Sequence, residues 1–306
     1  MKKSYLYAII TVFIWSTMAA VVKLMLYDIP NLQALSISSF LAAFFLLIMN
    51  VVGGKIKQMK TYTIKEYGIM SGLGFVGLFL YSALYYYGLA QLTSQVACIL
   101  NYLWPMMLVL FSCIILKERV TVMKVVAMGC SFLGIVILSV GNGGAETGIT
   151  ANGNLGMISC IVAAACYGLF SVLNKKADFD QNIAMMIMWL VVGICALVAG
   201  LVTENWVHFT EKQWLGMFWL GVVVDAIAYL LWALALKGTQ NTASVANMAY
   251  LTPFLSLLVS ALLLKERIEL QAVIALIFII GGILLQSILE GKKDDRQNET
   301  DIGQYT

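Results

Sequence analysis

The chain has 306 residues, of which 61% are hydrophobic and only 11% are charged. A soluble domain of this composition would expose too much apolar surface, whereas apolar runs of about 20 residues suit helices that cross a bilayer. The six cysteines lie inside such runs and none forms a Cys-x-x-Cys pair, so we expect no metal site, no disulfide framework and no cofactor. The expected environment is the lipid bilayer, and no nucleic-acid partner is expected.

Ten apolar runs, separated by polar turns, predict ten transmembrane helices. The first run is too long for the core of a signal peptide and lacks a small-residue cleavage site, so we expect it to be retained. In the third run, Gly68 and Gly72 have the spacing at which small residues let two helices approach closely. The predicted spans are residues 5–27, 33–52, 67–89, 93–116, 120–140, 155–173, 181–202, 213–236, 242–264 and 270–289.

The lysines and arginines predict the orientation of the chain. If the N-terminus is cytoplasmic and the spans alternate, fifteen of these residues fall on the inner side, and only Lys212, Lys265 and Arg267 fall on the outer side. Both termini are therefore predicted to be cytoplasmic, in an inner or plasma membrane protein. The polar residues 291–306 predict a disordered cytoplasmic tail.

One motif occurs twice along the chain. Asn101-Tyr102-Leu103-Trp104-Pro105 returns as Ala249-Tyr250-Leu251-Thr252-Pro253, and Leu-Lys-Glu-Arg follows each copy after an apolar run. This repetition predicts two homologous five-helix halves, residues 1–143 and 155–290, joined by an external linker at residues 144–154. The pairs that recur at the same offset of 148 positions are Pro105 and Pro253, Glu118 and Glu266, Gly134 and Gly282, and Tyr81 and Tyr229.

Five spans per half is an odd number, so the second half must cross the membrane upside down relative to the first. Pro105 and Pro253 lack a backbone donor, which predicts a locally broken helix in each half. Paired broken helices in inverted repeats commonly line a binding site near the middle of the bilayer and are a basis for alternating access. The predicted fold is an all-α membrane protein with two inverted five-helix repeats around a central cavity.

These features resemble those of a known family. The two five-span halves, Trp15-Ser16 in the first span, the proline helices and the Leu-Lys-Glu-Arg endings resemble the EamA-type drug/metabolite transporters. The segments 101–105, 231–236 and 249–253 are similar, more narrowly, to those of the YddG-like exporters of aromatic amino acids. The resemblance implies that spans one, three, four, six, eight and nine surround the central cavity.

Aromatic side chains on related faces of the two halves are candidates for substrate contact. Helical spacing places Tyr81 and Tyr85 on one face of the third span, and the repeat relates Tyr81 to Tyr229, with Trp232 about one turn further on. The ring of Trp15 could stack on a planar ligand. Simple packing between helices is the alternative for each of these rings.

Polar and aromatic residues precede each proline. Asn101 and Trp104 lie one turn apart before the first proline, and Asn247 and Tyr250 occupy the comparable turn before the second. Non-helical polar backbone at membrane depth is tolerated where it lines a cavity, so these four side chains are further candidates for substrate contact. An interhelical hydrogen bond is the alternative for the two amides.

Two of the charged residues inside predicted spans are candidates for a role in transport. A charge at the centre of a bilayer costs about 2.5–3.5 kcal/mol on insertion scales, so Asp225 is expected to have a role. It could bind a cationic group such as an α-amine, couple transport to protons, or make a structural hydrogen bond, and desolvation of the charged form favours the proton role. Lys23 could neutralise a substrate carboxylate or extend its amine to the membrane surface.

The sequence therefore predicts a secondary transporter that exports small metabolites, with aromatic or other apolar amino acids as the first candidate substrates. Export of lipophilic drugs or organic cations is the alternative, followed by a lipid-moving membrane protein. An enzyme is not expected, because the chain has one histidine in a loop, no zinc-ligand spacing and no phosphate-binding glycine loop.

Overall fold

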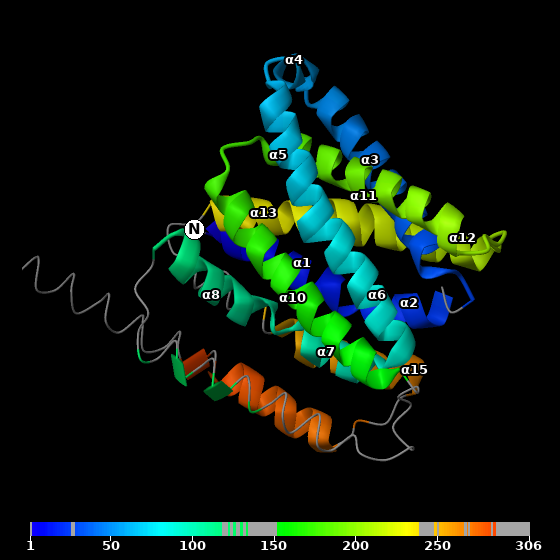
Figure 1. Ribbon diagram of the computed structural model, residues 1–306, viewed down its shortest axis with the longest axis vertical. Coiled ribbons are helices and arrows are strands. Elements are labelled where there is room, and N and C mark those ends of the chain that lie inside the picture. The colour runs from blue at the N-terminus through cyan, green and yellow to red at the C-terminus, as the bar shows by residue number, and fades with distance from the viewer. Residues whose placement is uncertain are drawn as a thin grey trace, which may run out of the picture.

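The computed structural model describes residues 2–25, 28–117, 152–238, 248–249, 251–265, 268, 270–282 and 284–285, with isolated positions between 122 and 133. The described residues form helices and short turns and include no strand (Figure 1). Seven helical stretches in this part of the chain are long and apolar enough to cross a membrane. The prediction of an all-α, multi-pass membrane protein is therefore confirmed, while the number of ten spans and the side of the termini stay predictions.

The seven stretches match predicted spans one to four and six to eight to within a few residues. They are Lys3–Met25, Asn31–Val52, Ile64–Gln91, Val96–Ile115, Gly153–Lys176, Gln181–Thr203 and Glu211–Lys237. A shorter apolar helix, Leu270–Gly282, lies within the tenth predicted span. Most of the fifth, residues 120–140, falls outside the described residues.

The spans are less regular than the sequence suggests. The predicted first span is interrupted at Thr17, whose backbone N–H and Oγ1 both donate to the Ile14 carbonyl, at 3.1 and 2.8 Å. The elements before the linker are α1 (Lys2–Ser16), α2 (Met18–Met25), α3 (Asn31–Val52), α4 (Ile56–Met59), α5 (Ile64–Gly74), the π-helix η1 (Phe75–Leu80), α6 (Tyr81–Gln91), α7 (Ser94–Asn101) and α8 (Trp104–Ile115).

The elements after the linker repeat this local geometry. Both α5 and α12 begin with a capping box and continue into a π-helix, which ends directly before Tyr81 in one half and Tyr229 in the other. Lys117 and Lys265, which follow α8 and α15, both have a left-handed backbone, with φ of 56° and 53°. These elements are α10 (Gly153–Lys176), α11 (Gln181–Thr203), α12 (Glu211–Phe218), η2 (Trp219–Ala228), α13 (Tyr229–Lys237) and α15 (Leu251–Leu264).

Helices α3 and α11 lie side by side and antiparallel (Figure 1). The Glu204 carboxylate, just beyond α11, accepts hydrogen bonds from the backbone of Leu32 (3.0 and 3.1 Å) and Gln33 (3.0 Å) at the start of α3. At the other end, Asn50 Nδ2 donates to the Asn182 carbonyl at 3.2 Å. The start of each helix therefore contacts the end of the other.

The first helix of each half packs against the third helix of the other half. Along α1 and η2, Thr11 Oγ1 donates to the Ala228 carbonyl at 3.2 Å. Along α10 and α6, Gly88 lies so close to Cys160 that a Cβ at Gly88 would collide with the thiol sulfur. Such reciprocal contacts are expected between two copies related by a two-fold axis.

The close helix contacts involve other glycines than those predicted. A Cβ added at Gly68 or Gly72 would meet nothing within 4 Å, so these two positions do not mediate a close approach between helices in the described part of the chain. A Cβ at Gly74 would instead come within 2.8 Å of the Met188 Cα, and one at Gly221 would collide with the backbone of α3. The spacing rule therefore indicated the right span and the wrong face.

Candidate functional site

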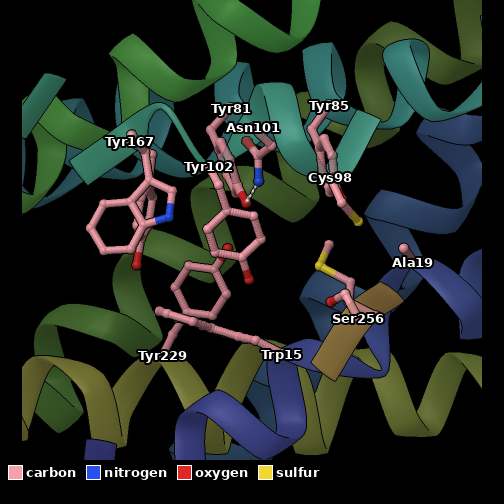
Figure 2. Close-up of a pocket in the computed structure, with 12 residues that line it drawn as sticks. Trp15, Ala19, Tyr81, Tyr85, Cys98, Asn101, Tyr102, Tyr167, Tyr229 and Ser256 are labelled. Atoms are coloured by element: carbon pink, nitrogen blue, oxygen red, sulfur yellow. Dashed lines mark hydrogen bonds between the residues drawn. The ribbon is translucent and has the colours of Figure 1, made fainter. Parts of the chain in front are cut away.

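A cavity with an empty volume of about 420 Å³ lies between the two halves (Figure 2). Among the described residues, twelve line it, of which seven are aromatic and none is charged. They come from both halves: Trp15, Met18, Ala19, Tyr81, Tyr85, Cys98, Asn101, Tyr102, Trp104, Tyr167, Tyr229 and Ser256. We call this space the central cavity.

The helix break before Pro105 supplies several of these residues. Helix α7 ends at Asn101, and α8 begins at Trp104 after a turn that contains Tyr102. Pro105 has no N–H to donate to the Asn101 carbonyl four residues earlier, so the helix cannot continue regularly through this point. The helix is interrupted at this point, and residues 101, 102 and 104 line the central cavity.

A cluster of rings closes one side of the central cavity. The Trp15 ring centroid lies 6.5 Å from that of Trp104, 6.2 Å from Tyr167, 5.4 Å from Tyr229 and 5.2 Å from Trp232. Most of these contacts are edge-to-face, the geometry that the quadrupoles of aromatic rings favour. The cluster joins helices of both halves, so a relative movement of the halves has to rearrange it.

Polar atoms are interspersed among the rings. Asn101 Nδ2 donates to the Tyr81 hydroxyl at 3.1 Å, as Figure 2 shows, and the Tyr85 hydroxyl and Cys98 Sγ are 3.3 Å apart. Asn101 Oδ1, Trp15 Nε1 and the Tyr167 hydroxyl are buried and have no hydrogen-bond partner in the structure. Buried polar groups are normally hydrogen-bonded, so these atoms are available to a polar ligand. The arrangement suits a small, largely planar molecule that carries a few hydrogen-bonding groups.

A second cavity, with an empty volume of about 330 Å³, adjoins the first. Tyr167 and Tyr229 line both spaces and form the wall between them, with their ring centroids 5.8 Å apart. The second cavity is lined by Tyr167, Phe170, Ser171, Asn174, Lys175, Met185, Tyr229, Trp232, Ala233, Leu236 and Lys237.

The structure brings most of the predicted substrate-contact residues together. Asn247 and Tyr250 lie outside the described residues, as does the side chain of Pro253, whose backbone belongs to α15. Trp232 lines the second cavity, and Tyr229 lines both. The predicted residues that line the central cavity are Trp15, Tyr81, Tyr85, Asn101, Trp104 and Tyr229.

The two predicted charged residues line neither cavity. Lys23 Nζ donates to the Leu92 carbonyl at 3.1 Å. Asp225 is 2% exposed and lies near the side chain of Ser38 on α3, while its Oδ2 has no hydrogen-bond partner in the structure. Its carboxyl therefore lies at a contact between helices.

Sequence reasoning missed Tyr102 and Tyr167, although both line the central cavity. Tyr102 belongs to the proline motif that was identified. Tyr167 could have been identified from a second repeat spacing of 152 positions between the first spans of the two halves. This spacing relates Trp15 to Tyr167 and Lys23 to Lys175. The first spans of the two halves follow this offset instead of 148, because the connections between spans differ in length.

Comparison with known proteins agrees with this architecture. The model of the EamA-like transporter family matches residues 2–140 and 154–288, once in each half. A solved crystal structure with 20% sequence identity covers 94% of this chain and 96% of its own, with a TM-score of 0.73, which shows a shared fold.

Several relatives are transporters. An uncharacterised transporter of Clostridium kluyveri is 24% identical over 96% of each chain, and the uncharacterised transporter YoaV of Bacillus subtilis is 25% identical over 94% of this chain and 97% of its own. The aromatic amino acid exporter YddG of Ancylobacter novellus is 27% identical over 71% of this chain and 75% of its own. On its two family matches and its membrane-spanning helical architecture, the chain belongs to the EamA-like transporter family.

Proposed function

We propose that the protein is a secondary transporter that exports small metabolites, with aromatic amino acids as the first candidate substrates. The observation that carries this proposal is the central cavity, which has seven aromatic lining residues and several unpartnered polar atoms. The rings offer faces and edges to a planar side chain, and the polar atoms offer partners to amino and carboxylate groups.

Alternating access between inverted repeats is the proposed mechanism. The antiparallel pairing of α3 with α11, and the reciprocal packing of α1 with α13 and of α10 with α6, support two halves related by inversion. Such halves provide two equivalent routes to one site. In this scheme, the wall formed by Tyr167 and Tyr229 separates the central cavity from one route, and its displacement opens that route.

Transport by the purified protein in liposomes tests the substrate class. We expect saturable movement of labelled tryptophan, phenylalanine or tyrosine down a concentration gradient. Trp15→Leu should raise the KM about tenfold, because an aromatic contact at the cavity is lost, whereas Phe13→Leu should leave it unchanged, since Phe13 is 60% exposed on the same helix. Inactivity towards all three amino acids would refute the substrate assignment.

Organic cations are the alternative substrates, because aromatic faces also attract cations. None of the described lining residues of the central cavity is acidic, and Asp225 lies elsewhere, so a cation would rely on the rings alone. Competition in the same liposomes separates the two classes. Stronger inhibition by tetraphenylphosphonium than by unlabelled tryptophan would favour the cation alternative.

A further inference from the structure

The second cavity is built from the positions that are equivalent to those of the central cavity. The offset of 152 relates the first spans of the two halves, and the offset of 148 relates the third spans. Residues of the central cavity therefore have counterparts that line the second one: Trp15 and Tyr167, Met18 and Phe170, Ala19 and Ser171, Tyr81 and Tyr229, and Tyr85 and Ala233. The two spaces are thus matching grooves of the two halves.

The second cavity differs chemically from the central cavity at the end that is lined by Lys175 and Lys237. By the same offsets, Asn174 stands where the first half has Val22, and Lys237 stands where it has Leu89. Lys175 also lines this space. The second cavity therefore combines an aromatic floor with an amide and two ammonium groups, while no acidic residue is among its described lining residues.

Lys175 and Lys237 are exposed lysines that contribute to the lining of the second cavity. Lys237 Nζ donates to the Phe179 carbonyl at 2.7 Å, which holds the amine at the end of α13. In the described part of the chain, the nearby Asp180 carboxylate is paired with Lys55 at 2.7 Å, and neither Lys175 nor Lys237 forms an ion pair. Asp178 and Asp180 attract Lys237 without forming an ion pair with it, so its ammonium group is still able to bind a ligand carboxylate.

Asn174 offers the complementary group. Its Nδ2 donates to Gln181 Oε1 at 3.0 Å, and Gln181 Nε2 donates in turn to the Phe179 carbonyl at 3.4 Å, which fixes the orientation of both amides. Asn174 is 6% exposed, and its Oδ1 is buried without a hydrogen-bond partner in the structure. A buried amide oxygen without a hydrogen-bond partner is an acceptor for the ammonium group of a ligand.

We propose that the second cavity is a docking subsite for the zwitterionic head of an amino acid, on the side of the membrane that bears Lys175 and Lys237. The carboxylate lies against these two lysines, the ammonium group donates to Asn174 Oδ1, and the aromatic side chain packs on Phe170 and Trp232. The substrate passes from this subsite to the central cavity when the tyrosine wall moves. This inference rests on the proposed function and adds the recognition of the head group.

Transport measured separately from each side of the membrane tests the proposal. Everted vesicles present the side predicted to be cytoplasmic to labelled tryptophan, and right-side-out vesicles present the other side. The double variant K175M/K237M should raise the KM about threefold to tenfold in everted vesicles only, because the lost charges contact the substrate on that side alone. Lys176→Met is the matched control, since Lys176 is exposed in the same last turn of α10 but does not line the cavity.

The unaltered protein provides a second test that needs no substitution. Tryptophanamide keeps the ring and the ammonium group but lacks the carboxylate, so it should compete with tryptophan at least threefold less well in everted vesicles than in right-side-out vesicles. In K175M/K237M this difference between the two sides should disappear.

Three results would overturn the subsite. The first is a change of KM in K175M/K237M that is equal on both sides of the membrane, which would show that the two lysines stabilise the helix ends. The same change of KM in Lys176→Met would show an effect of the general surface charge and would also overturn the subsite. The third is equal competition by tryptophanamide from both sides of the unaltered protein. Absence of tryptophan transport by the unaltered protein would instead refute the proposed function, and the subsite with it.

Discussion

Asn101 and Asp225 are both buried polar residues inside apolar spans, yet they have different surroundings. Asn101 is 5% exposed and lines the central cavity, where its Nδ2 bonds the Tyr81 hydroxyl and its Oδ1 is free of partners in the structure. Asp225 is 2% exposed and faces Ser38 on the neighbouring helix. Hydropathy marks both residues as exceptions, but only packing shows which one a substrate can reach.

Asp225→Asn should leave substrate affinity unchanged, because the side chain lies outside the lining of both cavities and the amide keeps its size and hydrogen-bonding capacity. The measurement is the KM for tryptophan in liposomes, with and without an imposed pH gradient. If the variant loses a response to the gradient that the unaltered protein shows, the proton-coupling role is supported. A tenfold rise in KM would contradict the placement of Asp225 away from the substrate.

Gly221→Ala should destabilise the protein by about 1–3 kcal/mol, because the added methyl group collides with the backbone of α3 at Ser38. Gly72→Ala is the matched control on α5, where a Cβ meets nothing within 4 Å and the higher helix propensity of alanine is favourable. Thermal unfolding in detergent measures both variants. Equal melting temperatures would show that η2 and α3 are less tightly packed than the structure indicates.

At the scale of the elements, breaks caused by proline were predictable and those caused by packing were not. Pro105 cannot donate to the Asn101 carbonyl, so the break between α7 and α8 follows from covalent chemistry. The π-helices η1 and η2 and the interruption at Thr17 have no such marker. The residues of η1 are apolar throughout, so this segment carries no hydrophobic period in which an irregular turn would be visible.

The pairing of α3 with α11 makes a prediction at this scale. Glu204 accepts three hydrogen bonds from the first turn of α3, where the N–H groups have no partner within the helix. Glu204→Gln should therefore lower stability by about 1–2 kcal/mol, because the negative charge at the helix start and part of this capping are lost. Asp28→Asn, an exposed acidic residue shortly before the same helix, should have no measurable effect in thermal unfolding. An unchanged melting temperature for Glu204→Gln would argue against the cap.

At the scale of the whole molecule, the positions of seven spans were predictable from the sequence, but the choice of neighbouring helices was not. A helix face buried against protein and one facing lipid are both apolar, because lipid tails are as apolar as leucine. Phe44 is 62% exposed and Trp189 is fully buried, although both lie in the middle of apolar runs. The offset of 152 relates Tyr167 to Trp15 in the sequence, but the place of Tyr167 in the central cavity depends on this choice of neighbours and is seen only in the structure.

The proposed inverted arrangement predicts which segments can be labelled from outside the cell. Thr147→Cys, in the predicted external linker, should react with a membrane-impermeant maleimide on intact cells, whereas Gln304→Cys, in the predicted cytoplasmic tail, should react only after the membrane is permeabilised. A mass shift with a polyethylene-glycol maleimide reports the reaction. The variant without an added cysteine is the control for the six native thiols. Labelling of both positions from outside would contradict two halves of opposite orientation.

Tyr167 and Tyr229 belong to both cavities at once, so the two chambers share a single partition. A molecule that enlarges one chamber by pushing these rings aside does so at the expense of the other. Simultaneous filling of both chambers is therefore disfavoured, and each binding event opposes the next until the first molecule has left. Under the proposed alternating access, this shared partition predicts that cargo moves singly, one molecule per conformational cycle.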